Sequence, residues 1–192
     1  MKKVVSSIVA VILFSFSATA TEPVGDEKKE VKTETSIVTW KAYKVTGSHV
    51  GTLALKEGSL LFDEGKLTGG EFVIDMTSIA STDLEGEDKG KLEGHLKSDD
   101  FFGVESHPTA KLVFTSVEAS GKNSYEVVGD LTIKGITKAV TFDISVYGSK
   151  ATATMKVDRT QYNVKYGSGS FFENLGDKTI YDEFDLVVDL EF

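Results

Sequence analysis

The chain has 192 residues, of which 21 are Lys or Arg and 30 are Asp or Glu, so its formal net charge at pH 7 is −9. Binding to nucleic acid and docking on anionic lipid both depend on cationic side chains, so this charge disfavours both kinds of partner. The chain contains no cysteine. Disulfides and lipid attachment to a cysteine are therefore excluded.

The N-terminal segment has the pattern of a signal peptide. Lys2 and Lys3 precede an apolar run over residues 4–16, and Ala18-Thr19-Ala20 supplies the small residues of a cleavage site. The run is shorter than the roughly 20 residues that a membrane-spanning helix needs, which favours a cleaved peptide over an uncleaved anchor. We therefore expect a signal peptide over residues 1–20, a periplasmic or secreted mature protein, and no stable membrane anchor.

The rest of the chain predicts a leader followed by one domain. Residues 21–34 are polar and mixed in charge, which is typical of a flexible polar leader. Strand character dominates from residue 35 to residue 192, with predicted strands at 37–45, 52–58 and within 59–76. Within the last of these, Asp63-Glu64-Gly65-Lys66 predicts a hairpin turn, because Gly accepts a positive φ.

A polar segment over residues 83–97 interrupts the strands. Leu92 and Leu96 are spaced as on one side of a helix, although Gly90 and Gly94 weaken it. After a short turn that contains two phenylalanines, strands return at 110–117, 125–133, 138–146, 151–157 and 184–192. About eight strands with one apolar face predict an antiparallel meander, closed as a barrel or packed as a sandwich.

Two segments resemble a known family. Residues 95–110 (HLKSDDFFGVESHPTA) and residues 129–142 (GDLTIKGITKAVTF) are similar to signature segments of the YceI-like domain, a family of exported lipid-binding β-barrels. The resemblance extends at lower quality over residues 35–192. It implies an all-β, antiparallel, eight-stranded, lipocalin-like barrel with a short helical insertion.

The same resemblance implies a ligand: a long-chain isoprenoid or another amphiphilic lipid in an apolar tunnel. Most aromatic residues lie on the apolar phase of their strands, so they are expected to point inward. The residues that we expect to line the tunnel are Trp40, Phe72, Ile74, Phe102, Leu112, Phe114, Val140, Phe142, Ile144, Phe184 and Leu186. Burial of an alkyl tail would contribute roughly 25 cal/mol per Å² of apolar surface.

The sequence offers little for catalysis. His49, His95 and His107 are not spaced as metal ligands, and Gly167-Ser168-Gly169-Ser170 is interpreted as a flexible loop. We therefore expect no catalytic residue, no metal site and no cofactor. Arg159 is interpreted as a structural clamp across a barrel end or, alternatively, as a contact to a ligand headgroup. Two other functions remain open: a structural or stress-response module with a filled core, and an enzyme that modifies a lipid or quinone.

The N-terminal pattern gives a direct prediction. Protein recovered from the extracytoplasmic space should begin at Thr21, because cleavage after Ala20 removes the apolar run. N-terminal sequencing of that material checks the cleavage site. An intact Met1, or a chain that stays in the membrane fraction, would contradict the prediction.

Overall fold

The computed structural model describes residues 27–192, so the expected signal peptide and residues 21–26 of the expected leader lie outside the described residues. The described part contains nine strands and one α-helix, α1 (Gly86–Lys97). The strands are β1 (Glu27–Glu30), β2 (Ile37–Lys44), β3 (Gly47–Asp63), β4 (Lys66–Ser81), β5 (Thr109–Ala119), β6 (Ser124–Ile133), β7 (Ile136–Tyr147), β8 (Lys150–Asp158) and β9 (Ile180–Glu191). Two short 3-10 helices, η1 (Arg159–Tyr162) and η2 (Gly176–Lys178), lie between β8 and β9.

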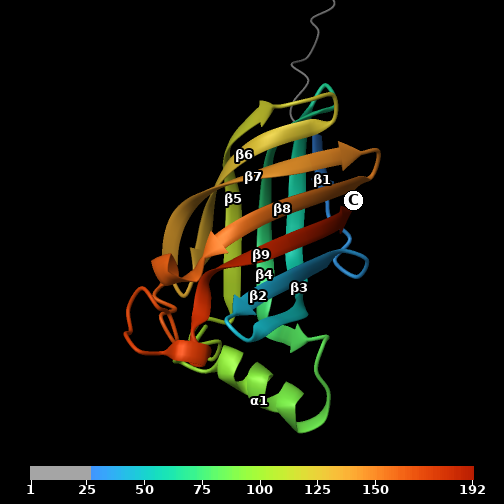
Figure 1. The fold of residues 1–192 in the computed structure, drawn as a ribbon. Coiled ribbons are helices and arrows are strands. Elements are labelled where there is room, and N and C mark those ends of the chain that lie inside the picture. The colour runs from blue at the N-terminus through green and yellow to red at the C-terminus, as the bar shows by residue number, and fades with distance from the viewer. Residues whose placement is uncertain (1–26) are drawn as a thin grey trace, which may run out of the picture.

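The sheet closes on itself as an antiparallel barrel. From β2 to β9 each strand pairs with the next one in the chain, and β9 returns to pair with β2. Figure 1 shows the strands wrapped around one interior, with α1 lying across one end. The sequence pattern left barrel and sandwich open, and the β2–β9 pairing shows the barrel.

The strand β1 explains how nine strands form an eight-stranded barrel. β1 pairs with Ser59–Phe62 at the end of β3, whereas β2 pairs with Gly47–Leu53 on the same side of β3. The two strands therefore share one position in the barrel, one after the other. The expectation of a flexible leader up to residue 34 is wrong for residues 27–34, because β1 is paired and Val31 is buried. Its charged sequence gives no apolar signal, and main-chain hydrogen bonds hold the strand.

Short turns set the register of the barrel. The predicted hairpin at residues 63–66 is confirmed, with Glu64 and Gly65 at φ values of 48° and 77°. Lys134 and Gly135 join β6 to β7 in the same way, with φ values of 50° and 72°. Two successive positive φ values are the geometry of the turn whose twist matches that of paired strands.

The helical insertion lies where the sequence predicts it, over residues 86–97 of the predicted 83–97. Acidic residues occupy its first turn and Lys97 its last, which complements the helix dipole. The insertion, the long segment between β8 and β9, and the β2–β3 and β6–β7 turns all lie at one end of the barrel, which we call the helix end. Both described chain termini lie at the opposite end, which we call the packed end.

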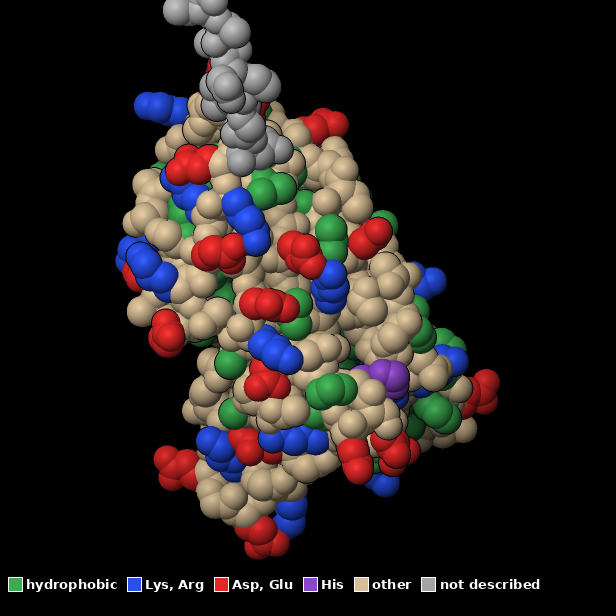
Figure 2. Space-filling view, turned by 180° about the vertical axis from the view of Figure 1, so that it is seen from behind, with side chains coloured by type: hydrophobic (Ala, Val, Ile, Leu, Met, Phe, Trp, Pro, Cys, Tyr) green, Lys and Arg blue, Asp and Glu red, His purple; other side chains and the backbone are tan. Residues whose placement is uncertain are grey.

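The packed end is filled with side chains. Leu60 and Val127 are 0% exposed there, and the rings of Phe62 and Phe192 lie 5.6 Å apart. Charged side chains of both signs are interspersed on the outer surface (Figure 2). Exposed ion pairs such as Lys111–Glu71 contribute little to stability. The apolar interior is therefore the main source of stability.

The segment between β8 and β9 is more ordered than the sequence suggests. The expectation of a flexible loop at residues 167–170 is wrong at its centre, because Ser168 is fully buried and forms a bridge with Ile180. The amide of Ile180 donates to the carbonyl oxygen of Gly167 at 2.8 Å. These backbone bonds attach the segment to the start of β9.

Alanine substitutions at two glycines are expected to change the free energy of unfolding in opposite directions. A Cβ at Gly51 would overlap with the Ala80 carbonyl oxygen and the indole of Trp40, so Gly51→Ala should lower the free energy of unfolding by about 1–3 kcal/mol. A Cβ at Gly90 of α1 would meet nothing within 4 Å, so Gly90→Ala should raise it by roughly 0.5–1 kcal/mol. Urea unfolding of both variants checks this. Equal effects of the two substitutions would contradict the packing of Trp40 on Gly51.

Candidate functional site

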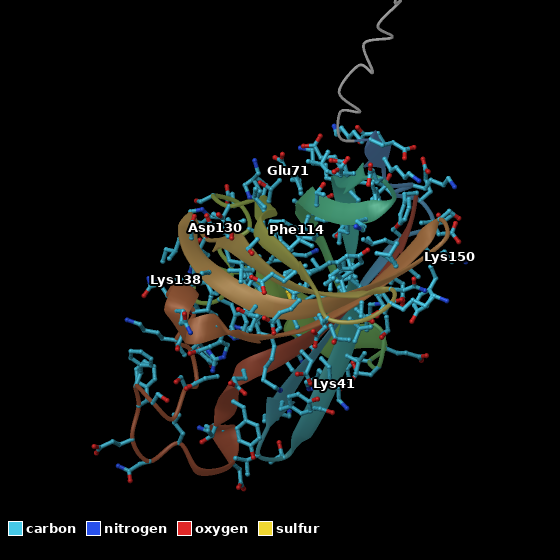
Figure 3. All side chains as sticks on the ribbon, turned by 90° about the horizontal axis from the view of Figure 1, so that it is seen from above. Lys41, Glu71, Phe114, Asp130, Lys138 and Lys150 are labelled. Carbon is cyan, nitrogen blue, oxygen red and sulfur yellow. The ribbon has the colours of Figure 1, made fainter. Side chains whose placement is uncertain are left out.

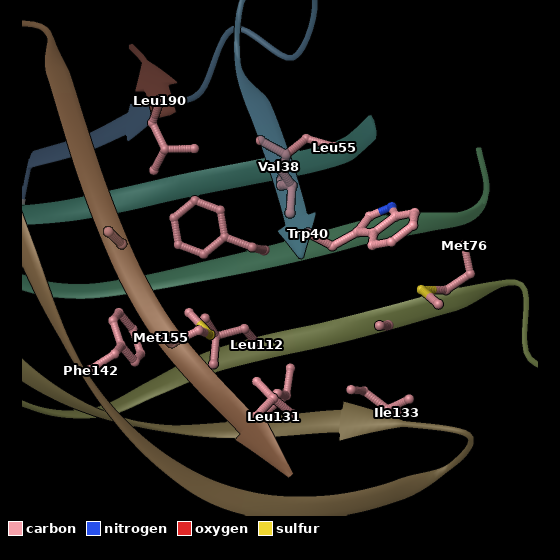
Figure 4. Close-up of a cluster of buried hydrophobic side chains, with 14 of the residues drawn as sticks. Val38, Trp40, Leu55, Met76, Leu112, Leu131, Ile133, Phe142, Met155 and Leu190 are labelled. Atoms are coloured by element: carbon pink, nitrogen blue, oxygen red, sulfur yellow. The ribbon is translucent and has the colours of Figure 1, made fainter. Parts of the chain in front are cut away.

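The helix end of the barrel encloses an apolar cavity. The volume open to the centre of a water-sized sphere is about 120 Å³. Side chains from β2 to β9 line it, together with residues of α1 and of the segments next to it. Figure 4 shows Trp40, Leu112, Phe142 and Met155 converging on this interior from different strands. The view along the barrel in Figure 3 shows Phe114 inside, while the labelled charged residues lie outside.

Ten of the eleven residues expected to line a tunnel do line this cavity: Trp40, Phe72, Ile74, Phe102, Leu112, Phe114, Phe142, Ile144, Phe184 and Leu186. Val140 does not line it, and packs half-buried against the core. β7 pairs with β8 only from Asp143 onward, so Val140 lies before the point where the two strands meet. The alternating sequence of β7 places Val140 in phase with the lining residues, but it does not show where β7 and β8 separate.

Several lining residues were missed by the sequence analysis. Leu131 and Ile133 of β6, and Ala153 and Met155 of β8, also face the cavity. They alternate with polar neighbours in the same way as the expected residues do. The period-2 pattern of β6 and β8 is the signal that places them on the inward face.

The cavity is not filled by its own lining. On β9, Phe184, Leu186 and Val188 face the cavity and yet are only half-buried. At the packed end, by contrast, inward side chains such as Leu60 are covered completely. Inward apolar surface is therefore left without partner atoms, which forfeits dispersion contacts unless a ligand supplies them.

The segment after α1 covers the helix end of the cavity. Leu96, Phe101 and Phe102 line the cavity, and the two phenylalanine rings lie 5.0 Å apart. The Nζ atom of Lys134 donates to the carbonyl oxygens of Asp99 and Phe101 at 3.0 and 2.8 Å. The β6–β7 turn therefore holds the phenylalanines over the barrel. The insertion and the turn after it therefore pack over this end of the barrel.

Arg159 joins three segments at this end. Its side chain is 2% exposed, and it donates to the carbonyl oxygens of Tyr181, Val164 and Ile180 at 3.1, 2.8 and 3.0 Å. Its Nη2 atom lies 3.6 Å from Oδ1 of Asp182. Burial lowers the pKa of the guanidinium, while Asp182 and Asp158 oppose this effect. The three carbonyl bonds correspond to the clamp interpretation, although Arg159 also lines the cavity.

A short helix closes the gap between β7 and β8. η1 lies against β7 and β9 where β8 no longer pairs with β7. Tyr162 of η1 is buried, and burial raises its pKa to about 12, so the ring fills the gap as a neutral group. Its side chain is not among the residues that line the cavity.

The histidines lie in separate places. Nδ1 of His49 lies 3.0 Å from Asp83, and the ring of His95 packs 4.4 Å from the ring of Tyr166. Within residues 27–192, no three His, Asp or Glu side chains form a group that could hold a metal ion. Over the same residues, no helix is long and apolar enough to span a membrane.

Comparison with known proteins identifies the family. The YceI-like domain matches residues 29–192. This chain belongs to the YceI-like family. The match begins six residues before the domain start that the sequence predicted at residue 35, in agreement with the pairing of β1.

Relatives and solved structures extend the comparison. A UPF0312 protein of Pseudomonas putida (strain W619) is 31% identical over 114 residues, which is 59% of this chain and 57% of that protein. A UPF0312 protein of Photorhabdus laumondii is 36% identical over 98 residues, 51% of this chain and 48% of that protein. The chain therefore spans about half the length of these curated relatives.

Among solved structures, BcnA of Burkholderia cenocepacia has a TM-score of 0.65 at 24% identity and covers 83% of this chain and 98% of its own. A polyisoprenoid binding domain from Saccharophagus degradans has a TM-score of 0.55 at 14% identity and covers 84% of this chain and 97% of its own. At these identities the likeness shows a shared fold.

The Arg159 clamp gives a prediction. Arg159→Ala leaves three carbonyl oxygens and the Asp182 carboxylate without their buried partner, and should lower the free energy of unfolding by about 3–5 kcal/mol. The control is Lys156→Ala, which removes an exposed ion pair with Asp185 and should cost no more than about 1 kcal/mol. Thermal and urea unfolding check the difference. A stable Arg159→Ala variant with altered ligand binding would instead support the headgroup interpretation.

Proposed function

We propose that this protein binds the apolar tail of an isoprenoid, or of another long-chain amphiphile, inside the barrel. The observation that carries the proposal is the cavity itself, whose inward apolar side chains are left partly uncovered. The membership of the YceI-like family and the likeness to a polyisoprenoid binding domain support the choice of ligand. The signal-peptide pattern of residues 1–20 supports binding in the periplasm or outside the cell.

The mechanism needs shape and exclusion of water rather than a chemical step. Transfer of an alkyl tail from water contributes roughly 25 cal/mol per Å² of apolar surface, less the cost of immobilising the tail. An apolar cavity of about 150 Å³ holds a benzene molecule, so a cavity of about 120 Å³ has room for a short stretch of an alkyl tail. The enclosed volume therefore suits a stretch of tail, with the polar head near the helix end.

The lining of the cavity bears on the two alternative functions. A filled core would leave its inward side chains covered, whereas Phe184, Leu186 and Val188 are only half-buried. An enzyme acting inside the barrel would need an acid and a base at the substrate. Among the described residues that line the cavity, none is a carboxylate or a histidine. Tail binding is therefore the function that we propose.

The single tryptophan allows a direct test. Trp40 is the only Trp of the chain, and it lines the cavity. Titration with geraniol, farnesol and geranylgeraniol should change its fluorescence in a saturable way, because a bound tail replaces solvent or empty space beside the indole. No saturable change with any of these alcohols would contradict the proposal.

Two alanines on β8 provide a matched pair of variants. Ala153 lines the cavity, so Ala153→Phe should fill the space and abolish the Trp40 response with little change in stability. Ala151 is buried outside the cavity lining, so Ala151→Phe should instead overpack the barrel and cost about 1–3 kcal/mol. Unfolding curves and the alcohol titration separate the two effects. Full binding by a stable Ala153→Phe variant would place the ligand elsewhere.

A further inference from the structure

Four aromatic side chains are exposed at the helix end, close together in sequence. Tyr166, Phe171, Phe172 and Tyr181 are 49%, 49%, 50% and 52% exposed. Large apolar side chains that remain exposed are normally scattered singly over a soluble protein. These four lie within or directly after the segment that connects η1 to β9. We call residues 165–181 the aromatic loop.

Backbone hydrogen bonds fix the turn that exposes the two phenylalanines of the loop. The amides of Phe171 and Phe172 both donate to the carbonyl oxygen of Ser168, at 3.2 and 3.0 Å, and Ser168 itself is fully buried. The hydroxyl of Ser170 donates to Asp182 of β9 at 2.5 Å. The loop is therefore a defined turn fixed to the barrel. The exposure of the rings follows from that turn and not from a lack of structure.

The aromatic loop is continuous with the cavity. Tyr181 is half-exposed and also lines the cavity, as does its neighbour Ile180. The aromatic loop is hydrogen-bonded to this start of β9, so the exposed rings lie beside the edge of the cavity. A tail that enters or leaves the barrel at this edge passes the aromatic loop.

The charge of the loop indicates the kind of surface that it fits. Within the loop, Lys165 and Lys178 balance Glu173 and Asp177, in a chain whose net charge is −9. The Nζ atom of Lys165 lies 4.6 Å from the centre of the Phe171 ring. An aromatic ring with a lysine beside it suits the boundary between lipid headgroups and acyl chains. The acidic remainder of the chain disfavours a strongly anionic surface.

We propose that the aromatic loop docks the protein on a zwitterionic lipid bilayer, with Phe171 and Phe172 inserted among the headgroups. The helix end of the barrel then faces the bilayer, and a tail can move between membrane and cavity with little exposure to water. This proposal rests on the proposed function, because the docked orientation is useful only if the cavity takes a tail.

The experiment uses protein from the extracytoplasmic fraction and vesicles of phosphatidylcholine. The test variant combines Phe171→Ser with Phe172→Ser. The matched control is Tyr147→Ser, which removes a 62%-exposed aromatic at the packed end and leaves the loop intact. We expect the double variant to lose about tenfold or more in vesicle partitioning by co-flotation, and the control to match the wild type. All three proteins should keep their Trp40 response to farnesol supplied without vesicles.

The possible outcomes separate the two proposals. Wild-type protein that does not float with the vesicles, or a double variant that floats as well as the wild type, overturns the docking proposal. A wild-type dimer in light scattering that the double substitution dissociates also overturns it, because the loop then covers a second copy of this chain. If the loop binds vesicles but Trp40 does not respond to farnesol, the docking proposal is supported. Only the tail-binding proposal is then refuted.

Discussion

The pairing of β9 with β2 is the contact on which the rest of the molecule depends. It joins residues 180–189 to residues 37–44 and turns a meander into a closed barrel. Closure leaves no free sheet edge along these strands, and it places every second side chain in a shared interior. An eight-stranded barrel has an interior wide enough for side chains or for one slender ligand. The same contact therefore provides both the stability of the fold and the space inside it.

The same strands form two interiors of different character. On β3, Leu60 and Phe62 belong to the packed end, whereas Leu53 and Leu55 line the cavity. The difference follows the connections at each end. Tight turns and the chain termini close the packed end, and a helix with two longer segments covers the other. Inward side chains at the packed end are covered completely, whereas Phe184, Leu186 and Val188 at the cavity end are not.

Much of the fold could be predicted from the sequence, because alternation and turn chemistry are local signals. The strand order, the hairpin at Glu64 and Gly65 and most of the cavity lining follow from them. The strand β1 could not be predicted in this way, since Glu27-Lys28-Lys29-Glu30 has no apolar face and is held by main-chain bonds. Val140 alternates in step with Phe142 along β7, so the sequence predicts the same environment for both. Where β7 separates from β8 depends on the tertiary structure, which a local pattern does not show.

The contacts of Arg159 and of the aromatic loop also could not be predicted from local sequence patterns. The carbonyl partners of Arg159 at Ile180 and Tyr181 lie more than 20 residues away along the chain. The loop appeared flexible in the sequence because it contains Gly and Ser, yet the buried Ser168 fixes it. Contacts of this kind depend on how the closed barrel brings distant segments together.

The positions of the described termini have a consequence for handling the protein. The amide of Lys32 donates to the carbonyl oxygen of Glu191 at 2.7 Å, and Glu191 in turn donates its amide to the Ser36 hydroxyl at 3.0 Å. Both described ends of the domain are thus joined at the packed end, opposite the helix end with its cavity. A surface tether attached at Phe192 would therefore orient every immobilised molecule with its cavity facing the solution.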